Sequence, residues 1–401
     1  MTIRHDHARL DFHRLRFLAE GDEVVVGRVD TGSYAILPAD GAALLRELVA
    51  GRSPAAAARW YARTFGEPVD IDEFLDTVSE LGFLYEGSGP APEQRPVRWQ
   101  RAGRALFSAP AWICYAALFA AAIGALCADP RLLPTRHHVI FTHYLLVVEV
   151  VLFFGQLPLT LLHEAFHVLA GRRLGLPTRL TIGRRFYMVV FETAIDGLVV
   201  VPKRQRYLPM LAGMLADLLG IAVLTVVAYA TRSPGGEPIL IGRVCLALAF
   251  TSVARFAWQF YFFLRTDIYH LVANLLGCVD LHTVSGQLLR NRFHRLLGRP
   301  DRLVDESRWH PRDRRVARFY APLHALGYTF ATVMFVVVMI PLSWRFISGA
   351  VHTLCSPTAP LASVADAAVL LTLNLGQVAA ALVIAIRDRR RGPAADRKEI
   401  S

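Results

Sequence analysis

The chain has few charged side chains and few cysteines for its length. Of its 401 residues, 19% are charged and 54% are apolar, whereas soluble domains usually carry about 25% charged and about 45–50% apolar residues. Disorder is excluded, because it requires low hydrophobicity and high charge. Five cysteines spread over this length exclude a small disulfide scaffold. The apolar excess argues against a chain built only of soluble domains.

The N-terminal end lacks the apolar segment of a secretory signal. Residues 1–20 contain charged side chains and no hydrophobic run, so we expect the N-terminus to stay in the cytosol. Residues 1–90 are predicted to form a small soluble α+β domain. Two β-rich runs flank a turn at 30–32, namely Val24–Val26 and Ser33–Leu37.

Three segments with helical periodicity follow in this domain. Each begins at a residue type that caps helices: Asp40, Ser53 and Asp70. A short strand at Gly82–Tyr85 closes the domain. A strand pair, three helices and a closing strand make a winged-helix pattern.

The rest of the chain is dominated by long apolar runs. A linker and interfacial segment, 91–108, begins within the proline-rich stretch Gly87–Pro96 and leads into a membrane body, 109–401. Crossing a bilayer requires about 20 apolar residues. The runs of this length are 109–127, 139–162, 208–230, 239–264, 324–347 and 366–386. We therefore predict a mostly α-helical, polytopic membrane protein with about six transmembrane helices.

Basic residues are concentrated in alternate loops. With a cytosolic N-terminus, the outer loops at 128–138, 231–238 and 348–365 hold only Arg131, Arg136 and Arg232. The inner loops and the tail are rich in arginine, as the positive-inside rule requires. The net charge of +11 therefore reflects membrane topology. We expect a multi-pass protein of the plasma (inner) membrane with both termini in the cytosol.

Nucleic acid is not an expected partner, despite the net charge and the winged-helix pattern. A face that binds phosphate should be basic. The third predicted helix, which would enter a DNA groove, is acidic, with Asp72, Glu73, Asp76 and Glu80.

The residues suited to chemistry begin at the end of the second apolar run. His163-Glu164-Ala165-Phe166-His167 matches the H-E-x-x-H pattern of zinc peptidases. Residues i and i+4 share one face of a helix, so both imidazoles can bind one Zn²⁺. Glu164 lies where it can take a proton from the water that the metal activates.

A third ligand has to come from another segment. The candidates at a similar depth are Asp267, His270, Asp217 and the pair Asp280/His282. Asp267 follows the fourth apolar run at its cytosolic end, which is also the end where the two histidines fall. Asp217 and Arg255 lie at matched depth and are interpreted as an intramembrane ion pair.

The membrane part resembles the site-2 protease family of intramembrane zinc metalloproteases. The resemblance rests on the H-E-x-x-H motif, on the strand-like stretch Thr178–Val201, and on Gly213-Met214-Leu215-Ala216-Asp217. Arg265-Thr266-Asp267-Ile268-Tyr269 is similar to the Asp-Gly-Tyr motif of the branch found in peptide-maturation clusters, with Ile268 where that motif has Gly. The resemblance implies Asp267 as the third zinc ligand. Candidate contacts to these ligands or to the substrate are Tyr269, His270 and Asn274.

The N-terminal domain looks like the PqqD-like domains, which bind the leader segment of ribosomally made precursor peptides. The matching residues are Gly32-Ser33-Tyr34, Gly41 with Leu44 and Leu45, and Leu81-Gly82-Phe83-Leu84. This resemblance implies that a leader adds as a strand to the Val24–Leu37 edge.

Together the two resemblances predict a zinc endopeptidase that matures a peptide natural product. An exporter and other maturation enzymes are further expected partners. Two alternatives stay open: an intramembrane protease acting on a transmembrane signalling protein, and a non-catalytic scaffold or immunity factor that only binds peptide. Cys127 and Cys355 fall on the same predicted outer side, either as a disulfide or as free thiols.

Overall fold

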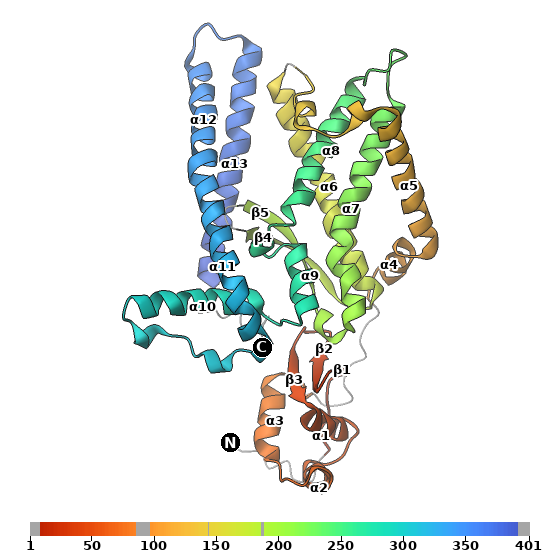
Figure 1. The fold of residues 1–401 in the computed structure, drawn as a ribbon, viewed down its shortest axis with the longest axis vertical. Coiled ribbons are helices and arrows are strands. Elements are labelled where there is room, and N and C mark those ends of the chain that lie inside the picture. Colours follow the sequence, from red (N-terminus) through yellow and green to blue (C-terminus); the bar gives the residue numbers. More distant parts are fainter. Residues whose placement is uncertain (1–8, 86–96, 143, 186–187, 392–401) are drawn as a thin grey trace.

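A computed structural model describes residues 9–85, 97–142, 144–185 and 188–391. Long helices form most of the molecule, and a small unit with three strands lies below one end of them (Figure 1). The proline-rich stretch Gly87–Pro96 lies outside the described residues. Residues 97–108 of the expected linker and interfacial segment are described.

The N-terminal unit consists of an antiparallel sheet followed by three helices. The strands β1 (Leu15–Glu20), β2 (Glu23–Arg28) and β3 (Tyr34–Pro38) lie in the order β1-β2-β3. The helices are α1 (Ala39–Val49), α2 (Pro54–Phe65) and α3 (Ile71–Glu80). The hydrophobic core between the sheet and the helices contains Val26, Leu45, Val78 and Phe83.

The sequence prediction for this unit missed β1. Its residues LRFLAE break the alternation of apolar and polar side chains that marks a half-buried strand, and β1 is held by its ladder with β2. The predicted closing strand is a single bridge between Phe12 and Leu84. Asp70 caps α3 as predicted. Asp40, however, lies within the first turn of α1, where it accepts a hydrogen bond from the Tyr61 hydroxyl.

Six helices in the described residues are long and apolar enough to cross a membrane, as predicted, which indicates a multi-pass membrane protein. They are α5 (Ala109–Ala128), α6 (Leu145–Arg173), α7 (Lys203–Ala230), α8 (Leu240–Trp258), α11 (Pro311–Met334) and α13 (Leu361–Arg391). A short helix, α4 (Gln100–Leu106), precedes α5.

Cys127 and Cys355 are free, so the disulfide alternative is wrong.

The bounds of five of these helices differ from the predicted runs. Helix α6 begins only at Leu145 and continues through the H-E-x-x-H motif, as expected, to Arg173, since the motif's polar side chains find partners inside the protein. Helix α7 begins earlier than predicted, at Lys203, and α13 is longer at both ends. Helix α8 ends at Trp258, before the predicted limit. Helix α11 continues through a π-helical turn, Phe335–Met339, into α12 (Ile340–Cys355).

A β-hairpin follows α6 where a strand-like stretch was expected. Strands β4 (Thr178–Arg185) and β5 (Met188–Ile195) are antiparallel and pack beside α6 (Figure 1). Gly171 allows this approach, since a Cβ there would lie 2.7 Å from Thr178 Cγ2. The hairpin therefore lies along the half of α6 that carries the motif.

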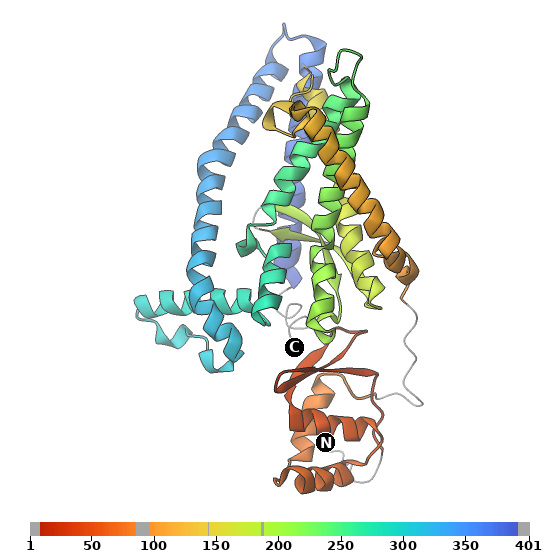
Figure 2. The same cartoon turned by 45° about the vertical axis from the view of Figure 1, so that its right-hand side comes forward.

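Two shorter helices complete the part of the fold that surrounds the site. Helix α9 (Asp267–Leu276) packs against α7, and α10 (Leu281–Leu296) packs against α11. The sheet of the N-terminal unit lies against the ends of α6, α7 and the hairpin, as the turned view shows (Figure 2).

Candidate metal centre

His163, His167 and Asp267 meet at one point between α6 and α9. The Nε2 atoms of the two histidines are 3.2 Å apart. Asp267 Oδ2 lies 3.3 Å from His163 Nε2 and 3.2 Å from His167 Nε2. Both histidines are buried, and Asp267 is only 9% exposed. Three potential ligand atoms thus form an almost equilateral triangle in the interior, and they are a group that could hold a metal ion.

The size of this triangle fits a tetrahedral metal site. Zinc bonds to nitrogen and oxygen of about 2.0–2.1 Å place neighbouring ligand atoms of a tetrahedron about 3.3 Å apart. The three observed separations are 3.2, 3.2 and 3.3 Å. Two imidazoles and one carboxylate also leave a fourth position for water or substrate, as in catalytic zinc sites.

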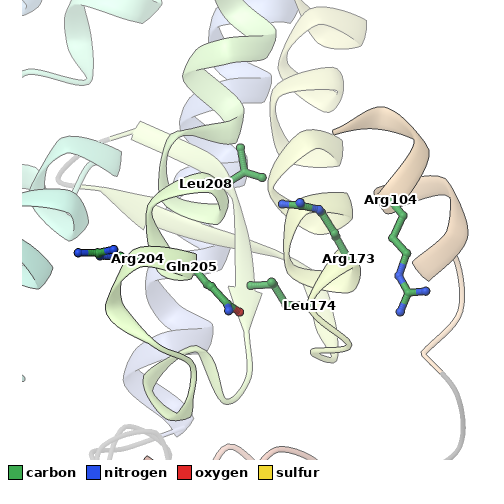
Figure 3. Close-up of a pocket in the computed structure, with 6 residues that line it drawn as sticks. All are labelled: Arg104, Arg173, Leu174, Arg204, Gln205 and Leu208. Carbon is green, nitrogen blue, oxygen red and sulfur yellow. The ribbon is translucent and has the colours of Figure 1, made fainter. Parts of the chain in front are cut away.

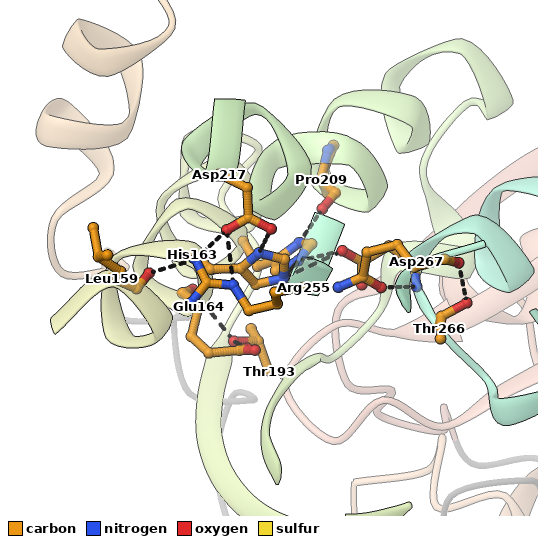
Figure 4. Close-up of polar contacts among 11 residues, drawn as sticks. Leu159, His163, Glu164, Thr193, Pro209, Asp217, Arg255, Thr266 and Asp267 are labelled. Atoms are coloured by element: carbon orange, nitrogen blue, oxygen red, sulfur yellow. Dashed lines mark hydrogen bonds and ion pairs between the residues drawn. The ribbon is translucent and has the colours of Figure 1, made fainter. Parts of the chain in front are cut away.

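The other nitrogen of each histidine is held by a partner that accepts a hydrogen bond. His163 Nδ1 donates to Asp217 Oδ2 over 3.0 Å, and His167 Nδ1 donates to the Pro209 carbonyl oxygen over 2.7 Å (Figure 4). Each ring therefore carries its proton on Nδ1, and in the neutral ring the Nε2 lone pair points into the triangle. Two lone pairs and a carboxylate at this distance repel one another unless a cation lies among them. Neutral imidazoles held in this way are oriented as metal ligands usually are.

Gly213 on α7 leaves the space that such a cation needs. A Cβ at this position would overlap the Nε2 atoms of both His163 and His167. No other residue type fits beside the triangle without moving the imidazoles. Sequence reasoning placed Gly213 on the third membrane helix and gave it no role in the site.

Asp217 and Arg255 form an ion pair behind His163. Arg255 Nη2 donates to Asp217 Oδ1 over 2.6 Å, and Arg255 Nη1 donates to Gln156 Oε1 and Thr160 Oγ1 on α6. The Asp217 side chain is fully buried. Asp217 is therefore a support for His163, and it holds the ring in the orientation that turns Nε2 toward Asp267 (Figure 4).

Asp267 is positioned by the start of α9. Thr266 is the N-cap residue, and its hydroxyl donates to the Gln259 carbonyl oxygen over 2.6 Å. The Asp267 amide donates to Gln259 Oε1. These two contacts fix the start of α9 and present the Asp267 carboxylate to the two histidines.

Glu164 is buried and faces the hairpin. Its Oε2 accepts a hydrogen bond of 2.7 Å from the Thr193 hydroxyl on β5 (Figure 4). This contact fixes one carboxylate oxygen and leaves the other available. Thr193 was not identified from the sequence, because only the packing of the hairpin on α6 brings it to Glu164.

The structure does not bring the other predicted contacts to the triangle. Tyr269 lies in the core shared by α9, α10 and α11, where its hydroxyl accepts from the His282 amide. Burial raises the pKa of Tyr269 to about 12. His270 is exposed and packs edge-on against Tyr269. Asn274 faces α7 and accepts a hydrogen bond from Arg206.

The remaining candidates for a third ligand have structural partners elsewhere. Asp280 caps α10. His282 packs against His324, with ring centroids 4.4 Å apart. Burial, together with the nearby His324 and Arg265, lowers the pKa of His282 to about 3, so this ring is neutral.

A cavity of about 520 Å³ lies at the ends of α4, α6 and α7 (Figure 3). Among the described residues that line it, none carries an imidazole, thiol or carboxylate and none belongs to the triangle: Arg104, Arg173, Leu174, Arg204, Gln205 and Leu208. The group that could hold a metal ion is the buried triangle, which is separate from the residues that line this cavity.

In comparisons with known proteins, no family model, curated protein or solved structure matches the chain. The functional interpretation therefore rests on the geometry and chemistry of the site.

Proposed function

We propose that this protein is a membrane-embedded zinc endopeptidase that cleaves a ribosomally synthesised precursor peptide. The cleavage would remove a leader or otherwise mature a modified peptide natural product. The observation that carries the proposal is the His163–His167–Asp267 triangle, which has the dimensions of a tetrahedral zinc site. The buried carboxylate of Glu164, next to His163 in α6, supplies a general base.

The chain's own residues divide the work of hydrolysis among them. His163, His167 and Asp267 would hold the zinc ion. When bound, the ion would act as a Lewis acid on the scissile carbonyl and would lower the pKa of a water molecule. Glu164 takes a proton from the attacking water and transfers it to the amine that leaves. Thr193 holds Glu164 in place. Asp217 keeps the His163 Nε2 lone pair turned to the site.

The N-terminal unit is proposed to capture the leader of the precursor. Its edge strands are β1 and β3, and β2 is central, so of the predicted Val24–Leu37 edge only β3 can accept an added strand. In the described residues, no strand pairs with the outer side of β3. Main-chain hydrogen bonds along β3 would give affinity without a deep pocket. The unit lies near the C-terminal end of α6, the end closer to the H-E-x-x-H motif (Figure 1).

Membrane orientation belongs to the same proposal. The excess of arginine in alternate loops supports a cytosolic position for both termini and for the N-terminal unit. A precursor made in the cytosol would then reach the unit directly. An exporter and further maturation enzymes are the expected partners on this pathway.

Metal analysis of the purified protein tests the enzyme class. We expect one zinc ion per chain, loss of that zinc in His163→Ala, and retention of it in Glu164→Gln. The Glu164→Gln variant should bind zinc yet lose peptide cleavage, by a factor of about 10² to 10⁴ if Glu164 is the general base. Wild-type protein without any bound metal would leave only the non-catalytic scaffold.

Cleavage assays separate the two substrate classes. Short peptides encoded beside the gene would be incubated with protein in lipid nanodiscs, and the products identified by mass spectrometry. Cleavage that requires the leader segment supports maturation. Cleavage of single-pass transmembrane segments without any leader would instead favour proteolysis of a signalling protein.

A further inference from the structure

The N-terminal unit shares a hydrophobic core with the membrane body. Val25 and Val29 pack with Leu176, Val200 and Val201, which lie at the ends of α6 and of the hairpin. The contact is close: a Cβ on Gly27 would come within 2.8 Å of Val200 Cγ1. This face of the sheet is therefore covered by the body and held at a defined distance from it.

A buried arginine lies at this junction. Arg206, in the first turns of α7, is 7% exposed. Its guanidinium donates to the Glu20 carboxylate at the end of β1 and to the carbonyl oxygens of Val199 and Val201. Its Nη1 donates to Asn274 Oδ1 over 3.3 Å. One side chain thus connects the N-terminal unit, the segment after the hairpin, and α9.

Asn274 is placed to pass this contact on to the metal ligands. Asn274 and Asp267 are seven residues apart on α9, which is two turns of one helix face. Both side chains reach toward the site side of the helix, Asp267 to the histidines and Asn274 to Arg206 on α7. Helix α9 is thus fixed at one end by its N-cap and toward the other end by Arg206.

We propose that Arg206 is a positioning residue that couples docking of the N-terminal unit to the placement of Asp267. This inference rests on the proposed function, because it assumes that the triangle binds a metal. Docking brings Glu20 to Arg206, Arg206 then holds Asn274, and α9 presents Asp267 to the histidines. The peptide-binding unit would thereby be part of the metal centre's support.

The chemistry of a buried guanidinium explains why Glu20 is needed. Its other acceptors among the contacts described are neutral carbonyl and amide oxygens, so Glu20 is its counter-charge. The nearby Lys203, 3.9 Å from Glu20, adds a second positive charge. Removing one partner of a buried ion pair leaves the other uncompensated, and the arginine must then shift toward water. That shift withdraws its hydrogen bond from Asn274.

Zinc affinity of the full-length protein, measured by competition with a chelator, tests the coupling. Loss of a group that supports a metal ligand typically lowers metal affinity by about 10- to 100-fold, and we expect Glu20→Gln to lower it by about 10-fold. Glu23→Gln is the matched control. Glu23 lies on β2 directly opposite Glu20, and its described contact with the body is to His310 at 3.7 Å rather than to Arg206. That variant should stay within about twofold of wild type. Asn274→Ala should weaken binding similarly, and combining it with Glu20→Gln should add little.

Two further measurements distinguish coupling from a general loss of stability. Co²⁺ bound in place of zinc should show an altered visible absorption spectrum in Glu20→Gln and an unchanged one in Glu23→Gln. Zinc should also slow amide exchange in Leu15–Glu20 of the wild type, because coupling is reciprocal, and should have no such effect in Asn274→Ala. Equal zinc affinity in Glu20→Gln and wild type would overturn the coupling but leave the proposed function intact. Absence of metal from wild type would overturn the function itself.

Discussion

Two arginines on either side of the metal ligands are neutralised in different ways. Arg255 on α8 pairs with Asp217 on α7, so both partners belong to the membrane body. Arg206 on α7 pairs with Glu20, which belongs to the N-terminal unit. The first pair supports His163, and the second contacts the helix that carries Asp267. The histidine side of the centre is therefore self-contained, whereas the aspartate side depends on a second unit of the chain.

This difference suggests how a buried group of potential metal ligands can depend on a second unit of the chain. Buried ion pairs contribute little net stability, because desolvation of both charges offsets their attraction. Their value here is geometric, since each holds one ligand-bearing element in a fixed orientation. A centre whose last ligand depends on docking can respond to what the docked unit binds.

The largest expected effect comes from filling the space that both sides share. Gly213→Ala should abolish zinc binding, because its Cβ would overlap the Nε2 atoms of both histidines. Gly220→Ala, on the same helix, is the matched control, since a Cβ there meets Leu159 Cδ2 at an ordinary 3.5 Å. Zinc content after purification measures both variants. Full zinc occupancy in Gly213→Ala would contradict the triangle as the metal site.

The second-largest effect, on both stability and zinc affinity, is expected from breaking the Asp217–Arg255 ion pair. Asp217→Asn leaves the partly buried Arg255 without its counter-charge and weakens the hydrogen bond to His163. We expect a loss of about 3–5 kcal/mol in the free energy of unfolding and a 10- to 100-fold loss of zinc affinity.

Denaturant unfolding in detergent micelles measures the first quantity, and chelator competition measures the second. Removing both charges, in Asp217→Asn with Arg255→Gln, should recover part of the stability but not the zinc affinity. The difference between the two ion pairs is confirmed if Glu20→Gln lowers zinc affinity but lowers the free energy of unfolding less than Asp217→Asn does. It fails if Asp217→Asn leaves both quantities unchanged.

The smallest effect concerns catalysis without metal binding. Thr193→Val removes the hydrogen bond to Glu164 and keeps the shape of the side chain. Hydrogen bonds to charged groups contribute about 1.5–3 kcal/mol, so kcat for peptide cleavage should fall by about 10-fold while zinc content stays constant. Thr181→Val on β4 is the control, because that hydroxyl donates to the Glu192 carbonyl oxygen on the neighbouring strand and, among the described contacts, to no residue of the site. A kcat for Thr193→Val equal to wild type would remove Thr193 from the site.

Much of the fold could be predicted because it depends on local patterns. Six apolar runs of membrane-crossing length correspond to six long helices, although only α5 has nearly the predicted bounds. Helix ends moved because hydropathy records side chains, whereas a helix continues wherever its polar groups find partners. Strand β1 escaped prediction since its pairing with β2, and not its own pattern, makes it a strand.

The candidate site could be predicted only in part. The spacing of His163 and His167 places both on one helix face in any helix. Asp217 was considered as a third ligand and interpreted as the ion-pair partner of Arg255, and the structure gives it contacts to both Arg255 and His163. Gly213 and Thr193 carried no distinguishing signal, because the residues they touch are tens of positions away in the sequence.

The sequence alone determined the number of long apolar helices and the pairing of two imidazoles with a carboxylate base. The first follows from the length of each apolar run. The second follows from the spacing of a few residues along one helix. Only the tertiary structure decided which acid meets the histidines and that Gly213 makes room for a cation. It alone also decided that Glu20 of the N-terminal unit neutralises Arg206. Those contacts join segments up to 186 residues apart, and such distances are set by packing and by the need of each buried charge for a partner.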